Sequence, residues 1–255
     1  MSERIVIETE GAIRKIRIDR PDKKNALTVA MYGALAEAIA DAGDNSQIKA
    51  IFLTGTEDSF TSGNDLNAFL QNPPSGHDSP VFRFLRGISS ARKPIVAAVN
   101  GLAVGIGTRM LLHCELVYAA ESARFHLPFV NLALVPEAAS SLLLPRLAGY
   151  QRAAELMLLG EPFGPQKALS VGIVTDIFPD RELQQKALGR AADLAAKAPA
   201  ALRATKALLK GADMPVEDRM VEEAVVFGRQ LQSPEARETM QAFLEKRPPD
   251  YSKFD

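Results

Sequence analysis

Apolar and polar residues alternate at the start of the chain in a pattern that predicts two β-strands. Ile5 and Ile7 lie on one side of an alternating run that Gly11 interrupts, and Ile16 and Ile18 continue the apolar positions after it. Two such runs joined by a short turn predict an antiparallel hairpin with one polar face.

After a polar loop over 20–25, the spacing of the apolar residues changes from that of a strand to that of a helix. Further along the chain, apolar residues again form short continuous runs. Thr28 can cap a helix that carries an apolar stripe. The stripe consists of Met31, Leu35, Ala38 and Ile39. Pro80 at a first helical position predicts a helix over 80–90. Continuous apolar runs predict buried strands over 50–54, 94–99, 115–119 and 173–178. Because strands and helices alternate, the fold class is α/β.

From about residue 182 onward the pattern is helical only. Pro199, Pro215 and Pro234 separate three amphipathic segments that are too thin to enclose a core. We therefore divide the chain into an α/β part, residues 1–195, and a helical C-terminal part, residues 196–255, which must pack on another surface.

Composition and charge narrow the functional classes. The 255 residues contain 30 Lys and Arg against 31 Asp and Glu, so a general nucleic-acid binder is not expected. A single cysteine, Cys114, excludes an internal disulfide and a Cys-rich metal site, and the three histidines form no ligand motif. The apolar runs are too short to span a membrane and the termini carry no targeting signal, so we expect a cytoplasmic protein.

Two glycine-containing segments follow predicted strands. Gly63, in Ser62-Gly63-Asn64-Asp65-Leu66, permits a tight turn that exposes backbone N–H groups, although an ordinary loop with a helix cap explains it too. The segment 100–107 opens a helix after a strand. Its glycines fit neither a dinucleotide nor a Walker-type motif, and they could serve close packing alone.

Glu137 is a carboxylate in an apolar run, and two interpretations remain open. It could be a first-turn glutamate of a helix that begins at Pro136, or a desolvated general base with a raised pKa. Arg109 could bind an anion or lie on a helix surface. His113 and Cys114 are adjacent and cannot form a nucleophile–base pair, so we interpret both as structural.

These segments, in this order, resemble the crotonase (enoyl-CoA hydratase/isomerase) superfamily over nearly the whole chain. The most specific stretches are Arg20-Pro21 to Asn25-Ala26-Leu27, Ser62 to Leu66 and Pro94 to Gly101. The resemblance implies a spiral of β-β-α turns with a helical C-terminal region that packs in a homotrimer, often a dimer of trimers. It also implies an acyl-CoA thioester substrate, with coenzyme A as part of the substrate and no further cofactor or metal.

The resemblance assigns roles to individual residues. The backbone N–H groups of Asn64 and Ile106 would form an oxyanion hole. The neighbours of Asn64, which are Ser62, Gly63, Asp65 and Leu66, would contact the substrate. Lys24, Asn25 and Ala26 match the loop that lines the adenine and ribose of CoA. Phe243 and Lys246 match a stretch that reaches the CoA of a neighbouring subunit. Phe129 would contact the substrate and, with Leu134 and Val135, exclude water.

Departures from the pattern indicate the reaction. The two catalytic glutamates of enoyl-CoA hydratases correspond here to Arg109 and Phe129, which cannot activate water. Glu137 instead matches the single catalytic glutamate of the peroxisomal-type 3,2-trans-enoyl-CoA isomerases. We therefore expect an enoyl-CoA isomerase in which Glu137 carries a proton from C2 to C4. The alternatives are hydration or another enolate reaction (hydrolysis, dehalogenation or decarboxylation), or a non-catalytic acyl-CoA-binding protein.

Overall fold

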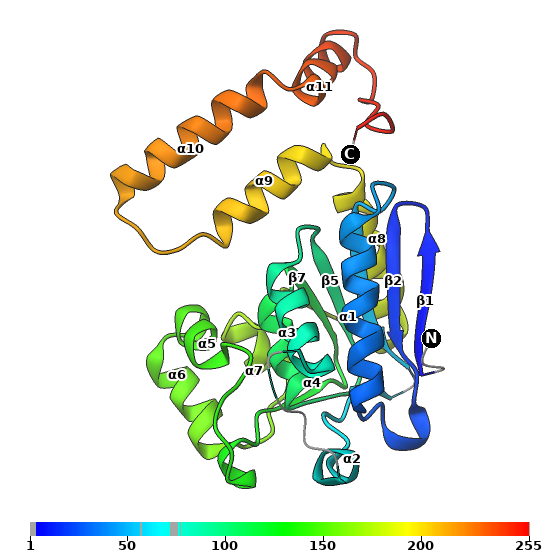
Figure 1. The fold of residues 1–255 in the computed structure, drawn as a ribbon, viewed down its shortest axis with the longest axis vertical. Coiled ribbons are helices and arrows are strands. Elements are labelled where there is room, and N and C mark those ends of the chain that lie inside the picture. Colours follow the sequence, from blue (N-terminus) through cyan, green and yellow to red (C-terminus); the bar gives the residue numbers. More distant parts are fainter. Residues whose placement is uncertain (1–3, 57, 72–75, 77, 255) are drawn as a thin grey trace.

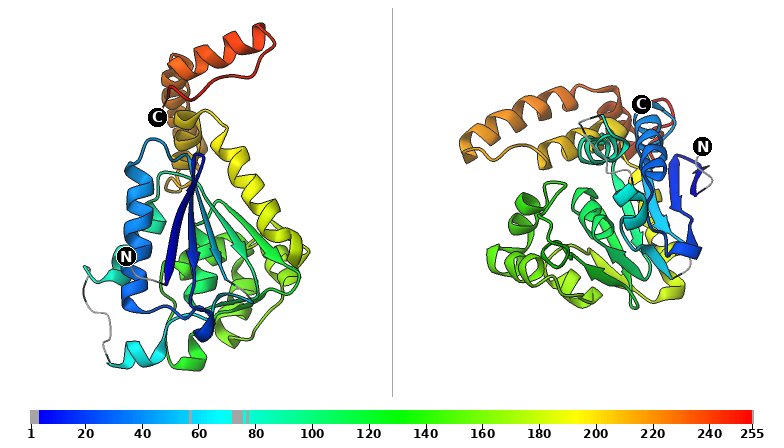
Figure 2. Two further views of the ribbon diagram at one scale, coloured as in Figure 1. Left: turned by 90° about the vertical axis from the view of Figure 1, so that its right-hand side faces the viewer. Right: turned by 60° about the horizontal axis from the view of Figure 1, so that its bottom comes forward.

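The computed structural model describes residues 4–56, 58–71, 76 and 78–254. A twisted sheet forms the centre, α1 and α3 cover one face, and α8 covers the other (Figures 1 and 2). The predicted loop over 71–79 is only partly covered, because Asn72–Ser75 and His77 lie outside the described residues.

The elements follow one another as short strand–strand–helix units. The strands are β1 Ile5–Glu10, β2 Ile13–Ile18, β3 Ala50–Gly55, β4 Ser59–Thr61, β5 Ile95–Val99, β6 Leu102–Val104, β7 Leu116–Ala120, β8 Arg124–His126 and β9 Asp176–Phe178. The α-helices are α1 Val29–Asp44, α2 Leu66–Gln71, α3 Pro80–Ser90, α4 Ile106–Arg109, α5 Ser140–Ala148, α6 Tyr150–Ala154, α7 Pro165–Ser170, α8 Asp180–Ala195, α9 Pro199–Leu209, α10 Val216–Leu231 and α11 Pro234–Leu244. Short 3-10 helices are η1 Pro21–Lys23, η2 Met110–His113 and η3 Val130–Leu132, and η4 Glu155–Leu159 is a π-helix.

The large sheet has the order β1-β2-β3-β5-β7-β9. Only β1 and β2 pair in antiparallel fashion, with Ile5 opposite Ile18, and this confirms the predicted hairpin. The other neighbours are parallel. Thr28 caps α1 as predicted, by accepting a hydrogen bond from the Met31 N–H at 3.3 Å. The last strand is shorter than predicted and begins at Asp176.

A second, three-stranded parallel sheet, β4-β6-β8, was missed by the sequence analysis. Each of its strands follows a strand of the large sheet within a few residues: β4 follows β3, β6 follows β5 and β8 follows β7. The segment 100–107 is therefore not a direct strand-to-helix turn, because Leu102–Val104 forms β6 before α4 begins. Strands of three residues are too short to give a readable alternation of side chains.

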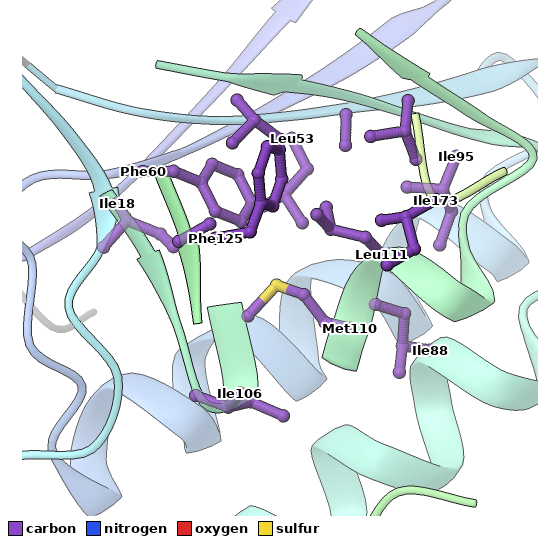
Figure 3. Packing of buried hydrophobic residues seen from close by; sticks show 14 of the residues in the cluster. Ile18, Leu53, Phe60, Ile88, Ile95, Ile106, Met110, Leu111, Phe125 and Ile173 are labelled. Atoms are coloured by element: carbon purple, nitrogen blue, oxygen red, sulfur yellow. The ribbon is translucent and has the colours of Figure 1, made fainter. Parts of the chain in front are cut away.

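Two apolar cores lie on opposite faces of the large sheet. Alternation along β3 places Ile51 and Leu53 in the larger core and Phe52 in the smaller one, which α8 covers. The larger core continues beneath the small sheet, where Phe60, Phe125 and Ile106 are almost inaccessible to solvent (Figure 3).

Helices α9, α10 and α11 extend away from the sheets, at the end of the molecule opposite α2 (Figures 1 and 2). Lys206 of α9 attaches them to the α/β part by donating hydrogen bonds to the Lys93 carbonyl at 2.6 Å and to Glu115 at 2.9 Å. In the described part of the chain, no helix is long and apolar enough to cross a membrane.

Candidate active site

A cavity of about 520 Å³ opens at the ends of the small-sheet strands. Because β4, β6 and β8 run parallel, the segments that follow them meet at one edge: Asn64 follows β4, Ile106 follows β6, and Phe129 and Glu137 follow β8. Most of the lining is apolar. The lining residues are Ser62, Gly63, Asn64, Leu66, Phe69, Val104, Gly105, Ile106, Arg109, Pro128, Phe129, Leu132, Leu134, Val135, Pro136 and Glu137.

Asn64 is fixed on both its backbone and its side chain. The Leu27 N–H donates to the Gly63 carbonyl at 2.8 Å, and the Asp65 N–H donates to the Leu27 carbonyl at 2.9 Å, so the Asn64 N–H between them donates to no backbone carbonyl of the described chain. The buried Tyr32 hydroxyl donates to Asn64 Oδ1 at 2.5 Å. Burial raises the pKa of Tyr32 well above its ordinary value, so the phenol keeps the proton that it donates.

Ile106 supplies a second free backbone N–H. It is the first residue of α4, where a helix has no internal partner for its N–H groups. Its side chain belongs to the larger core (Figure 3), so only the backbone of Ile106 faces the cavity as a polar group. Gly107 lets α4 lie close to β4, because a Cβ atom there would stand 3.0 Å from the Thr61 carbonyl oxygen. The packing role considered for these glycines therefore applies to Gly107.

Glu137 lies in the cavity but not in a helix. Helix α5 begins only at Ser140, so the interpretation of Glu137 as a first-turn residue is wrong. The carboxylate is also not desolvated in this chain, since 43% of its side chain is exposed. Instead, Glu137 Oε2 accepts a hydrogen bond from Nη1 of Arg109 at 2.7 Å.

Arg109 is buried, which corrects the helix-surface interpretation. Only 6% of its side chain is exposed, and its guanidinium carbon lies 5.0 Å from the centre of the Phe129 ring. A cation over an aromatic face is attracted by the ring quadrupole. Arg109 therefore contacts both the ring of Phe129 and the carboxylate of Glu137.

The predicted CoA loop borders the cavity without lining it. Lys24 is exposed, Ala26 is half-buried, and Asn25 is fully buried. The Asn25 side chain donates to the Ser59 carbonyl at 2.6 Å and accepts from the Arg20 N–H at 2.7 Å. Its amide is thus engaged inside the protein, and we correct its expected role from ligand contact to holding the loop.

Asp65 likewise has a partner within the chain. Nη1 of Arg20 donates to Asp65 Oδ2 at 2.7 Å, and this hydrogen bond lowers the pKa of Asp65 below its ordinary value. Asp65 also accepts from the Ala68 N–H at 3.2 Å, which fixes the start of α2. Its carboxylate therefore stabilises the loop around Asn64.

Phe243 and Lys246 do not reach the cavity of their own chain. Phe243 belongs to α11 and is 81% exposed, and Lys246 follows that helix. Helix α11 lies at the end of the molecule opposite α2, which borders the cavity (Figure 1).

Sequence reasoning missed the contributions of Tyr32, Phe69 and His113. Tyr32 and Phe69 are in ring contact, with centroids 6.2 Å apart, and Phe69 lines the cavity. His113 contacts the Ala138 carbonyl beside Glu137 at 3.0 Å. No local signal identifies these contacts, because each joins residues at least 25 positions apart. Among the described residues, no three His, Cys, Asp or Glu side chains gather in a way that could hold a metal ion.

Comparison with known proteins agrees with this architecture. Residues 8–253 match the family described as enoyl-CoA hydratase/isomerase, and the chain belongs to that family, which acts on acyl-CoA thioesters. The fold is the crotonase fold.

Relatives with different activities match at similar levels. The chain is 35% identical over 215 residues to enoyl-CoA delta isomerase 2 of Rattus norvegicus, covering 82% of this chain and 55% of that protein. The chain thus spans about half the length of that relative. It is 31% identical over 254 residues to 2,3-dehydroadipyl-CoA hydratase of Escherichia coli, covering 98% and 99% of the two chains. The solved enoyl-CoA hydratase/isomerase of Pseudoalteromonas atlantica T6c superimposes with a TM-score of 0.80 at 42% identity, covering 98% and 100%.

Proposed function

We propose that this protein is a 3,2-enoyl-CoA isomerase in which Glu137 is the single proton shuttle. The observation that carries the proposal is that Glu137 is the only carboxylate among the described residues that line the cavity. The free N–H groups of Asn64 and Ile106 lie in the same cavity. Hydration by two glutamates requires a second carboxylate, and Arg109 and Phe129 stand at the corresponding positions.

The mechanism uses one base and one oxyanion hole. The Glu137 carboxylate removes a proton from C2 of a 3-enoyl thioester, and the electron pair moves through the thioester carbonyl and the C3–C4 double bond to give a dienolate. The Asn64 and Ile106 N–H groups stabilise the thioester oxygen as it gains charge, and one such donor is typically worth about 2.7–4 kcal/mol of the barrier. Protonated Glu137 then returns the proton to C4, which leaves a double bond between C2 and C3.

The same proposal includes the oligomeric state of the protein. Phe243 and Lys246 can serve a CoA site only in another subunit, and α10 has no buried residue to attach it to its own chain. Both observations favour a homotrimer or a dimer of trimers, with residues 196–255 as the oligomerisation region. We expect this enzyme in the cytoplasm and without a cofactor beyond the CoA of its substrate.

The test is an assay of 3-hexenoyl-CoA and 2-hexenoyl-CoA in which double-bond migration and water addition are followed separately. We expect migration without hydration. A general base contributes roughly 10²–10⁴-fold, so Glu137→Gln should lose about that factor in kcat while still binding the CoA ester. Glu155→Gln is the matched control, because Glu155 is 52% exposed and paired with Lys167 but does not line the cavity. Wild-type-like turnover of Glu137→Gln would refute the proposal.

Hydration is the second candidate function. Leu134 and Val135 line the cavity, yet they are 58% and 79% exposed, so in a single chain they leave it open to water. Net water addition to 2-hexenoyl-CoA by the wild-type protein would favour this function over isomerisation.

A further inference from the structure

The segment that carries Glu137 is not held by regular secondary structure. It lies between η3 and α5, and Ala138 and Ala139 have backbone φ angles of 56° and 55°. Two consecutive non-glycine residues in the left-handed region cost free energy and persist only where their surroundings hold them. Because the Glu137 side chain is also partly exposed, the position of its carboxylate depends on contacts with the rest of the chain.

Two such contacts come from a single helical stretch. Arg109 ends α4 and His113 ends η2, about one turn farther on, and both are buried. Arg109 binds the Glu137 carboxylate, and His113 Nε2 lies 3.0 Å from the Ala138 carbonyl oxygen. One helical stretch thus holds the side chain of one residue and the main chain of the next.

Arg109 and His113 are both held in place, so each can serve as a fixed attachment point for the Glu137 segment. Arg109 is confined between Phe129 and Glu137, and the α4 helix that carries it packs closely on β4 at Gly107. Burial lowers the pKa of His113 below its ordinary value, which favours the neutral imidazole. A carbonyl oxygen can only accept, so Nε2 of His113 carries the proton and donates it.

We propose that Arg109 and His113 are positioning residues that clamp the Glu137 segment, leaving Glu137 Oε1 as the oxygen that accepts and returns the proton. In the described chain, Oε2 is occupied by Arg109, while Oε1 has no hydrogen-bond partner. The proposal rests on the proposed function, in which Glu137 is the proton shuttle. A misplacement of about 1 Å can cost a catalytic group about 10²-fold in rate, so a clamp of this kind affects kcat.

The first experiment compares two arginines whose side chains are largely shielded from solvent. Arg14 closely matches Arg109: its side chain is 12% exposed, its Nη1 contacts the exposed carboxylate of Asp41 at 2.5 Å, and its Nε is buried without a partner, as in Arg109. Arg14 does not line the cavity. We expect Arg109→Met to lower kcat for isomerisation by about 10²-fold with an almost unchanged KM. Arg14→Met should leave both constants near the wild-type values.

Rescue separates positioning from general destabilisation. Millimolar guanidinium chloride should restore part of the kcat of Arg109→Ala, with sodium chloride at equal ionic strength as the control. His113→Leu should lower kcat, whereas His113→Gln, whose side-chain amide can still donate to the Ala138 carbonyl, should retain most of it.

Amide hydrogen exchange gives a readout that does not depend on turnover. Peptides covering 133–142 should exchange faster in Arg109→Met and His113→Leu than in the wild type. In Arg14→Met they should exchange at the wild-type rate. Unchanged kcat, an effect on KM alone, or unchanged exchange in the Arg109 variant would each overturn the clamp. A wild-type protein without isomerase turnover would instead overturn the proposed function, and the clamp with it, before any variant is compared.

Discussion

The α/β part and the C-terminal helices of this chain differ in how far their apolar side chains are buried. In the α/β part, apolar side chains fill two cores on either side of the large sheet. Helix α10 has an amphipathic sequence but no buried residue, and Val221 and Val225 are 66% and 59% exposed. The first region therefore encloses its own core, whereas the second leaves apolar side chains exposed, as the proposed oligomerisation region would.

The largest effect is expected from a glycine of the α/β part. Gly101 has a φ of 57°, and a Cβ atom there would stand 1.6 Å from the Asp58 carbonyl oxygen. Gly101→Ala should therefore cost more than about 4 kcal/mol and abolish cooperative thermal unfolding followed by circular dichroism. The control is Gly189→Ala in α8, where a Cβ meets nothing within 4 Å and a gain of about 0.5–1 kcal/mol is expected. A Gly101 variant with wild-type melting would contradict the comparison.

A smaller effect is expected in the C-terminal region, and it concerns assembly. The double variant Val221→Asp/Val225→Asp places charges on α10 without disturbing a core of its own chain. We expect the particle mass from light scattering after size-exclusion chromatography to fall towards that of one chain, because an unpaired charge is costly in an apolar contact. Glu223→Gln, on the same helix, should leave the mass unchanged. Equal masses for the double variant and the wild type would mean that this face contacts no partner.

A still smaller effect is expected next to the cavity. Tyr32→Phe removes the hydrogen bond to Asn64 Oδ1 but keeps the ring against Phe84. A hydrogen bond of this kind is worth about 0.5–1.5 kcal/mol, so kcat for isomerisation should fall roughly three- to tenfold with KM preserved. Tyr118→Phe, in the smaller core, serves as the control. If both variants keep the wild-type kcat, Tyr32 does not support the oxyanion hole.

The smallest effect is a pH dependence of stability. The pKa of His113 is lowered in the folded chain from its ordinary value of 6.5, so below that pH the unfolded chain binds more protons than the folded one. Stability should therefore fall as the pH drops below about 6.5 and level off below the folded-state pKa. Urea unfolding at a series of pH values should show this slope in the wild type and a weaker one in His113→Gln. An identical slope in both proteins would assign it to other groups.

The sequence predicted the large sheet well and the small sheet not at all. Runs such as 50–54 are long and apolar enough to indicate a buried strand, and β3 covers them. Three-residue strands such as Leu102–Val104 are defined by pairing with distant strands rather than by their own pattern. Local spacing cannot reveal such pairing.

The candidate site was likewise predictable only in part. The resemblance to known enzymes selected Asn64, Ile106 and Glu137, and all three line one cavity. The pairing of Glu137 with Arg109 was not predictable, because Arg109 lies 28 positions away and the sequence left open whether it binds an anion or lies on a helix surface. Asn25 shows the converse error: it matches a ligand-binding loop, yet its amide is satisfied inside the protein.

The order of the spiral also bears on how the protein is made. Asn64, Ile106 and Glu137 follow three successive strands of the small sheet, so the cavity closes one segment at a time along the chain. Domains synthesised on the ribosome begin to fold from the N-terminal end. A nascent chain that stops before β8 can form the hairpin and the first pairs of parallel strands, but it lacks the third wall of the cavity. Under the proposed function, substrate binding can therefore stabilise this protein only late in its synthesis, after the segment with Glu137 has emerged.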